Sequence, residues 1–410
     1  MQTQEEIINL LEKEDQTQVL RFADQLSDQQ KQTLFDQISA VDFSMIREAR
    51  KPQEEEKEAV IEALSTMTID QIKASREAYE TIGKKVLSEG KVAAVLLAGG
   101  QGTRLGYDGP KGTLNIGLTR PLYLFQILLG NMEKNLEGTG RYMHLYIMTS
   151  ALNDQATRDF FRKHDYFGYP KEYIHFFQQE MAPALDRDGH MLLADKDKLC
   201  LAPNGNGGWF RSLEHNGMIE DMKKSGVEWL NVFSVDNVLQ NIADPVFIGA
   251  TIACRQYAAA KVIAKATPEE KVGAVCLRNG RPSVVEYSEL SDQMRYAKDE
   301  KGQYLYNYGV TLNYLFHLQK TQKMAQKHLP IHKALKKINC LDEQGHLIIP
   351  DAPNAYKLEY FIFDILQFFD SILSYEVVRQ DEFAPIKNKS GVDSLDTARA
   401  LLVNKTGITL

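Results

Sequence analysis

The 410-residue chain contains few cysteines, and they lie far apart. None belongs to a C-x-x-C pair, and none has a histidine at zinc-finger spacing: Cys200, Cys254, Cys276 and Cys340. This pattern argues against a disulfide framework or a structural zinc site and favours reduced thiols in the cytosol. The chain begins with polar and acidic residues, whereas a secretory signal begins with basic ones. We therefore expect a cytoplasmic protein.

Long apolar runs and an excess of positive charge are also missing. The most apolar late stretch, residues 361–378, is interrupted by Asp364, Asp370 and Glu376, so it predicts a buried element and no membrane span. The sum of 48 Lys and Arg minus 55 Asp and Glu is −7, which argues against a nucleic-acid partner but allows a local basic pocket for a small anion. With 43% hydrophobic and 25% charged residues, the composition is that of a soluble globular protein. The length of 410 residues predicts two or three domains.

Glycine is nearly absent from the start of the chain, which is rich in Glu, Gln and Lys. We expect residues 1–90 to form an all-helical region, in which Ser27 and Gln30 have the sequence form of a capping box. A further helix is expected to begin at Pro52, because the acidic run that follows suits the positive end of a helix dipole.

From Lys91 onward, short apolar segments alternate with helical patterns such as residues 121–135 and 210–226. Strands alternating with helices predict an open, largely parallel α/β sheet, and we assign it to a catalytic domain over residues 91–325. The expected strands are residues 92–100, 144–150, 173–179, 227–237 and 260–266.

Two features mark the later part of the chain. Asn279-Gly280 lies between two strand-like runs in residues 272–290 and predicts a hairpin. Residues 326–410 are expected to form a small C-terminal α+β region of short helices and strands.

A glycine-rich loop follows the first expected strand, in the segment LLAGGQGTRLGYDGPKG at residues 96–112. Glycines after a buried strand let backbone N–H groups approach phosphates, and Arg104 and Lys111 add cationic side chains. A dinucleotide loop requires a third glycine where Leu105 stands, which argues against a dehydrogenase. A P-loop lysine follows a glycine, whereas Lys111 follows Pro110. Neither standard nucleotide motif fits this loop.

The string GGQGTRLGYDGPK is instead typical of nucleotidyltransferases that make nucleotide sugars. Six further motifs follow it: FFQQ (176–179), NGNGG (204–208), FSVDN (233–237), VVEYSE (284–289), FIFDI (361–365) and DEFAPIKN (381–388). Together they resemble the eukaryotic-type UDP-sugar pyrophosphorylases, most closely the UDP-N-acetylhexosamine pyrophosphorylase branch. The resemblance implies a Rossmann-like, mixed and largely parallel sheet of the nucleotide-diphospho-sugar transferase type.

The implied reaction joins UTP and a sugar 1-phosphate to give UDP-sugar and pyrophosphate. The attacking phosphate oxygen is already ionised at neutral pH, so it needs no general base. The enzyme must hold two repelling anions and neutralise the charge that develops in the transition state. None of the nine histidines has a spacing typical of a base or a ligand set, which agrees with this chemistry. Mg²⁺ is the implied cofactor.

By this resemblance, the loop and its cationic side chains hold the UTP phosphates: Gly99, Gly100, Gly102, Thr103, Arg104 and Lys111. Asp236, at the end of an expected strand, is the implied Mg²⁺ ligand, because this ion binds one or two carboxylates plus substrate phosphates. A helix cap is the alternative role for Asp236, and both roles can hold. Lys387 of the C-terminal region is implied to contact the α-phosphate, so Arg104, Lys111 and Lys387 are the expected catalytic residues.

Gln178 or Gln179 is implied to hydrogen-bond the uracil edge, and strand alternation turns only one of them inward. Which of the two does so is left open. The other residues that the resemblance places near substrate are Gly205, Asn206, Gly273, Glu286, Phe361 and Phe363. For the two phenylalanines, packing in the core is an equal alternative.

N-acetylglucosamine 1-phosphate is the leading sugar substrate by overall resemblance. Val310 stands where the family pattern has an asparagine near the N-acetyl sugar, and Asn204 and Thr113 also depart from that pattern. Glucose or galactose 1-phosphate is therefore an alternative substrate. An alternative of another class is a non-catalytic UDP-sugar sensor, which the presence of the cationic side chains and Asp236 disfavours. The sequence does not decide between a monomer and a homodimer.

Overall fold

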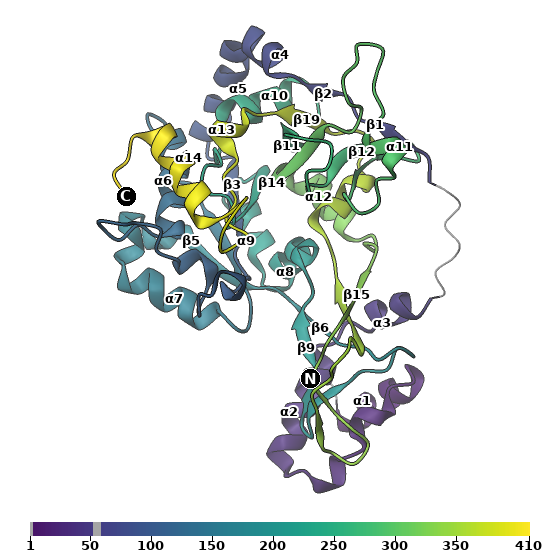
Figure 1. Ribbon diagram of the computed structural model, residues 1–410. Helices are drawn as coiled ribbons and strands as arrows, with labels where there is room; N and C mark the ends of the chain where they lie inside the picture. Colours follow the sequence, from purple (N-terminus) through teal and green to yellow (C-terminus); the bar gives the residue numbers. More distant parts are fainter. Residues whose placement is uncertain (1–2, 52–58) are drawn as a thin grey trace. The chain divides into compact units, whose positions relative to one another are not determined.

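A computed structural model describes residues 3–51 and 59–410 (Figure 1). The chain forms two compact units. Among the described residues, the smaller unit contains 3–51, 179–208 and 329–362, and the larger contains 59–178, 209–328 and 363–410. The two units are defined by which residues pack together, and each contains three stretches of the chain. The three expected regions are instead continuous stretches of sequence. The division into residues 1–90, 91–325 and 326–410 therefore stays a prediction.

The larger unit is built on a mixed, eleven-stranded sheet. Its strands are β1 (Ile61–Ala63), β2 (Thr66–Met67), β3 (Val92–Leu97), β4 (Leu145–Thr149), β5 (Ile174–Gln178), β10 (Trp229–Ser234), β11 (Ala258–Ala264), β12 (Ala274–Arg278), β13 (Arg281–Val285), β14 (Tyr308–His317) and β19 (Leu373–Glu376). The main path runs β2-β19-β11-β14-β10-β3-β4-β5, and only β14 along it is antiparallel to its neighbours. The predicted mixed, largely parallel α/β sheet is confirmed.

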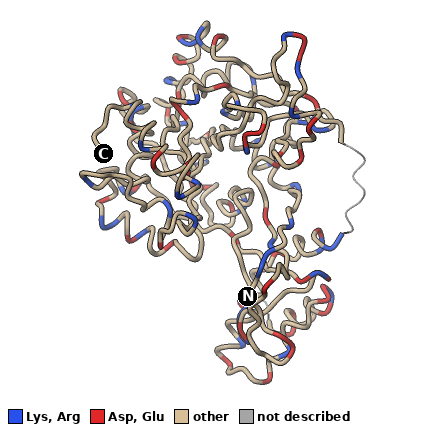
Figure 2. Tube along the Cα trace, in the orientation of Figure 1, with Lys and Arg blue, Asp and Glu red and all other residues tan. Residues whose placement is uncertain are grey.

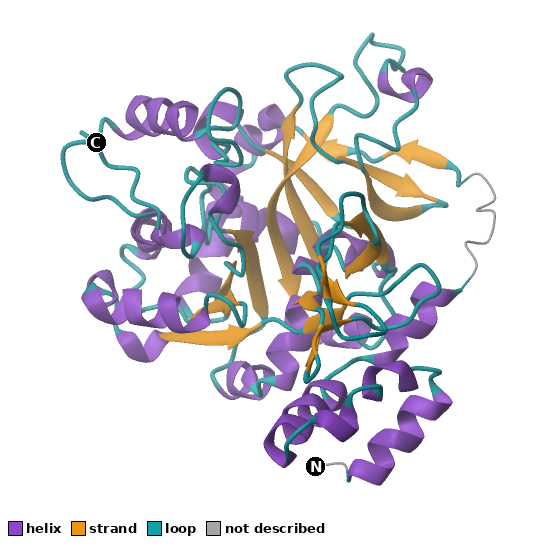
Figure 3. Cartoon of the chain, turned by 60° about the horizontal axis from the view of Figure 1, so that its bottom comes forward, coloured by secondary structure: helices purple, strands orange, loops and turns teal. Residues whose placement is uncertain are grey.

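Helices flank this sheet (Figure 3). They are α4 (Ile69–Ala74), α5 (Arg76–Ser88), α6 (Leu124–Leu136), α7 (Asp154–Lys163), α8 (Trp209–His215), α9 (Met218–Lys224), α10 (Pro245–Ala253), α11 (Asp292–Arg295), α12 (Leu318–Ala325), α13 (Arg379–Glu382) and α14 (Leu395–Thr406). All six residues of β3 and of β10 are buried, because both faces of the sheet are covered there. The helical stretch predicted over 210–226 is confirmed as two helices, α8 and α9, which are separated at Gly217, whose φ is 73°.

The prediction that the first 90 residues are all helical is wrong, because β1 and β2 lie within them. β1 pairs with β12 and β2 with β19, so partner strands and not local propensity set their conformation. The helix expected to begin at Pro52 lies outside the described residues. The Asn279-Gly280 hairpin is confirmed, with positive φ values of 52° and 74° at the two turn residues.

The smaller unit combines helices with short two-stranded ladders. Its elements are α1 (Gln4–Lys13), α2 (Asp28–Ser39), α3 (Phe43–Arg50), β6 (Met181–Pro183), β7 (Leu193–Asp195), β8 (Lys198–Leu199), β9 (Leu201–Pro203), β15 (His332–Lys336), β16 (Cys340–Leu341), β17 (Leu347–Ile348) and β18 (Ala355–Glu359). The capping box is confirmed, since Ser27 and Gln30 each accept a hydrogen bond from the other's backbone N–H at the start of α2.

No helix among the described residues is both long enough and apolar enough to span a membrane. The apolar stretch 361–378 contains a 3₁₀ helix, η8 (Ile362–Phe368), followed by β19. Residues of both elements are buried, including Ile362, Leu366 and Leu373, so the prediction of a buried element is confirmed. Lys and Arg residues are interspersed with Asp and Glu residues along the trace (Figure 2).

Helices α5 and α10 are in close contact, and this contact depends on glycine. A Cβ atom at Gly83 would lie 1.9 Å from the carbonyl oxygen of Pro245. We expect Gly83→Ala to lower the free energy of unfolding by about 1–3 kcal/mol, because the clash outweighs the gain in helix propensity. The control is Gly130→Ala in α6, where no atom lies within 4 Å and a gain of about 0.5–1 kcal/mol is expected. Equal changes in a urea unfolding series would contradict this account of the contact.

Candidate functional site

The glycine-rich loop after β3 folds back on itself. The N–H of Gly102 donates to the carbonyl of Gly109 at 3.0 Å, and the N–H of Lys111 donates to the carbonyl of Gly100 at 3.2 Å. A Cβ atom at Gly102 would lie 2.7 Å from the Tyr107 ring, so the turn excludes a larger residue there. The loop thus has a fixed, closed shape at the carboxyl end of β3.

Lys111 returns from this loop to the end of the neighbouring strand β10. Its Nζ lies 2.7 Å from Oδ1 of Asp236, in an ion pair whose lysine side chain is buried and whose carboxylate is 36% exposed. Because β3 and β10 are parallel, their carboxyl ends share one edge of the sheet. The structure therefore brings together two residues predicted from separate motifs. Arg104 and Thr103 of the same loop are exposed, and Arg104 has no ion pair with any residue that the structure describes.

Lys387 belongs to a segment that lies along the chain just after β10. The N–H of Ile386 donates to the carbonyl of Asp236 at 2.9 Å, and Pro385 forms a β-bridge with Asn237. Lys387 is the next residue, and its own N–H donates to the carbonyl of Asp393 at 2.7 Å. The C-terminal lysine is thus held within one residue of a direct contact with Asp236.

The residues expected around the sugar also meet in part. The N–H of Val310 donates to the carbonyl of Gly273 at 3.0 Å, and a Cβ atom at Gly273 would lie 3.2 Å from Oε1 of Glu286. β14 runs antiparallel to β10, with Asn313 opposite Phe233, so Val310 lies at the edge of the sheet where β10 ends. The sugar-side residues and the phosphate-side residues therefore share this edge.

Tyr314 is a residue that the sequence analysis missed. Its side chain is fully buried, and its hydroxyl has no hydrogen-bond partner among the described residues. Burial first, and then the charges of Glu286 and Asp364, raise the pKa of Tyr314. An aromatic residue in an apolar strand is usually a core residue, so the sequence carried no signal for it. Phe363, beside Asp364, is half-buried.

In the smaller unit, the NGNGG segment packs against residues 360–362. Gly205 has a φ of 87°, and a Cβ atom there would lie 2.4 Å from the carbonyl oxygen of Tyr360. The side-chain oxygen of Asn206 accepts a hydrogen bond from the N–H of Ile362 at 3.0 Å. Gly205, Asn206 and Phe361 therefore come from segments that touch, and the ring of Phe361 lies 4.3 Å from that of His332.

The two candidate glutamines differ in their surroundings. Gln178 is the exposed last residue of β5, whereas Gln179 is buried. Gln178 lies near Asp154 of α7, whose carboxyl has a lowered pKa. Burial raises this pKa, but hydrogen bonding with Arg158, Thr149 and Gln178 lowers it by more. Exposure and burial do not select one of the two for uracil, and the choice between the glutamines stays a prediction.

An open α/β sheet with a closed glycine loop, a loop lysine and a strand-end carboxylate at one edge defines a protein of the nucleotidyltransferase class. The family described as UTP–glucose-1-phosphate uridylyltransferase matches residues 40–407. The chain therefore belongs to this family of uridylyltransferases, as the resemblance predicted, and it is an enzyme of that class.

Three relatives show the extent of the similarity. UDP-N-acetylhexosamine pyrophosphorylase-like protein 1 of Xenopus tropicalis is 36% identical over 417 residues, which cover 96% of this chain and 82% of the relative. UDP-N-acetylglucosamine pyrophosphorylase of Saccharomyces cerevisiae is 38% identical over 336 residues, 78% of this chain and 70% of the yeast protein. The crystal structure of uridine diphosphate N-acetylglucosamine pyrophosphorylase from Trypanosoma brucei matches with a TM-score of 0.82 and 28% identity, over 98% of this chain and 85% of that one.

Proposed function

We propose that this chain makes UDP-N-acetylglucosamine and pyrophosphate from UTP and N-acetylglucosamine 1-phosphate. The observation that carries the proposal is the meeting of Lys111 with Asp236, beside the segment that holds Lys387. The yeast and trypanosome relatives, named for N-acetylglucosamine, support this choice of sugar.

The site suits a reaction between two anions. Loop N–H groups other than those of Gly102 and Lys111, which donate within the loop, hold the UTP phosphates together with Arg104, and Lys111 exchanges its carboxylate partner for a phosphate oxygen. Lys387 neutralises charge at the α-phosphate while the sugar phosphate attacks in line and pyrophosphate leaves. No proton has to be removed from the nucleophile, so a catalytic base is not required.

Asp236 fits the role of a Mg²⁺ ligand. Its carboxylate is partly exposed at a strand end, and the described residues contain no group of three or more His, Cys, Asp or Glu side chains that could hold a metal. A single carboxylate is enough for Mg²⁺, which takes its remaining ligands from water and substrate phosphates. When bound, the ion supplies positive charge to the phosphates.

The test is pyrophosphate release by the purified chain with Mg²⁺ and UTP, with four sugar 1-phosphates in parallel. These are the 1-phosphates of N-acetylglucosamine, N-acetylgalactosamine, glucose and galactose. We expect N-acetylglucosamine 1-phosphate to give the highest kcat/KM. A higher value for glucose or galactose would transfer the proposal to that sugar, and no release with measurable UDP-sugar binding would contradict catalysis.

Val310 offers a way to test the sugar pocket. We expect Val310→Asn to raise the ratio of kcat/KM for N-acetylglucosamine 1-phosphate over glucose 1-phosphate by about fivefold, because a new amide hydrogen bond contributes about 1 kcal/mol. Val60→Asn, at an exposed valine, is the control and should leave the ratio unchanged. An unchanged ratio in both variants would remove Val310 from the pocket.

The cysteines support a place in the cytosol. All four are free, and Cys200, Cys276 and Cys340 are buried. Burial raises the pKa of Cys200 to about 12 and that of Cys276 to about 11, so these thiols remain protonated and unreactive.

A further inference from the structure

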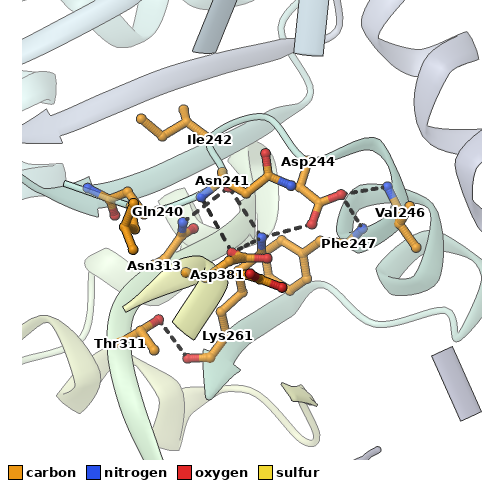
Figure 4. Close-up of polar contacts among 12 residues, drawn as sticks. Gln240, Asn241, Ile242, Asp244, Val246, Phe247, Lys261, Thr311, Asn313 and Asp381 are labelled. Atoms are coloured by element: carbon orange, nitrogen blue, oxygen red, sulfur yellow. Dashed lines mark hydrogen bonds and ion pairs between the residues drawn. The ribbon is translucent and has the colours of Figure 1, made fainter. Parts of the chain in front are cut away.

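A lysine lies in the middle of the central sheet, where apolar residues are the rule. Lys261 of β11 is 1% exposed and follows three alanines. Its Nζ donates to Oδ2 of Asp244 at 2.8 Å and to the carbonyl of Asn241 at 3.2 Å (Figure 4). It also donates to Oε2 of Glu382 at 2.7 Å. Burial disfavours the ammonium, but the two carboxylates outweigh it and raise the pKa of Lys261. The lysine is thus charged, with all three donors occupied.

The three partners of Lys261 belong to two different segments. Asn241 and Asp244 lie in the chain between β10 and α10, and the Asp244 side chain also caps α10 by accepting from the N–H of Val246 at 2.9 Å. Glu382 is the last residue of α13 and leads into the segment that carries Lys387. Lys261 therefore ties the C-terminal segment to the chain that follows Asp236.

From Glu382 onward, this tie continues residue by residue toward the site. The side-chain amide of Asn237 donates to the carbonyl of Glu382 at 2.7 Å, and its oxygen accepts from the N–H of Ala384 at 2.9 Å. The next backbone bond joins the N–H of Ile386 to Asp236, and Lys387 follows. Among the residues that form this tie, Lys261 is the one that comes from β11. It binds Glu382, which is the end of the segment farthest from Lys387.

We propose that Lys261 and Glu382 are positioning residues, which act through the segment 382–386 to hold Lys387 next to Asp236. This inference rests on the proposed role of Lys387 in the reaction. In this role, neither Lys261 nor Glu382 has to touch substrate. Lys261 is buried and the Glu382 side chain is only 14% exposed, so solvent screens their ion pair little and each of its members needs its partner. A hydrophobic contact would also hold the segment, but it would fix the position of the segment along the chain after Asp236 less closely than these hydrogen-bonded ion pairs do.

Glu382→Ala separates this role from general stability, because Lys261 keeps Asp244 as a counterion. We expect kcat to fall about tenfold and the KM for UTP to change less than about threefold, since a small displacement of a charge-neutralising group weakens only the transition state. The matched control is Asp381→Ala, which removes an exposed carboxylate from the neighbouring position and should keep the wild-type kcat.

The decisive measurement is a double-mutant cycle with Lys387→Ala. If Glu382 acts through Lys387, Glu382→Ala in the Lys387→Ala background changes kcat less than about twofold. An equal loss of kcat in both backgrounds would overturn the proposal, as would a wild-type kcat for Glu382→Ala. If the alanine variant does not fold by circular dichroism, Glu382→Gln, which keeps the shape of the side chain, is used in the same cycle.

Failure of this inference can be told apart from failure of the proposed function. If the wild-type chain forms UDP-sugar but Lys387→Ala is fully active, the positioning role is overturned and the reaction stands. If the wild-type chain forms no UDP-sugar with any of the four sugar 1-phosphates, the proposed function itself fails.

Discussion

Replacing Asp236 with asparagine is expected to lower kcat about 10³-fold, the scale on which a group that stabilises transition-state charge contributes. The amide keeps the size of the side chain and can still accept a hydrogen bond from Lys111, which lies 2.7 Å from the carboxylate. What it loses is the negative charge that binds a divalent cation. The loss should therefore appear in the Mg²⁺ titration, with the midpoint moved to higher concentration.

Two outcomes separate the roles of this carboxylate. If kcat falls while the Mg²⁺ midpoint is unchanged, Asp236 orients Lys111 and is not a metal ligand. If neither changes, Asp236 is outside the catalytic machinery. Asp221→Asn is the control, because this exposed carboxylate of α9 has the same chemistry on the surface. Its activity and its Mg²⁺ dependence should equal those of the wild type.

The centre of the sheet could be predicted from the sequence because strands such as β3, β4 and β10 are buried on both faces. A segment such as residues 92–97 is wholly apolar, and such runs between helical patterns indicate a parallel strand. β2 could not be predicted in this way. It is two residues long, and its strand conformation depends on pairing with β19, which is distant in the chain. The two interleaved units are beyond prediction for the same reason, since each joins segments that no local pattern connects.

The residues of the site also differ in whether the sequence could predict them. Lys111 and Asp236 both follow expected strands, and the carboxyl ends of parallel strands share one edge of a sheet, but their roles came from the resemblance. Lys387 is an exposed residue near the end of the chain, and only the resemblance pointed to it. Lys261 was missed although the sequence carried a signal. A lysine inside the run AAAKVIA can be buried in a folded strand only if it has a charged partner. The identity of those partners, Asp244 and Glu382, required the fold.

Lys387→Ala is expected to lower kcat roughly 10²-fold while the dissociation constant for UTP changes less than about threefold. A group that meets the α-phosphate chiefly as charge develops on it contributes to the transition state and little to ground-state binding, so the loss falls on kcat. The segment that carries Lys387 should be unaffected, because its bonds to Asp236 and Asn237 come from the backbone of Ile386 and Ala384.

Lys389→Ala is the matched control, because it removes an exposed lysine two residues farther along. UTP binding is measured by calorimetry and kcat by pyrophosphate release. Near wild-type turnover of Lys387→Ala would remove this lysine from the site, and a parallel loss of UTP binding would assign it to ground-state binding of the nucleotide. A lysine that arrives from the C-terminal segment acts on the reacting phosphate only if that segment is in place. If Lys261 and Glu382 have the positioning role proposed above, the rate therefore depends on residues that do not meet the substrate.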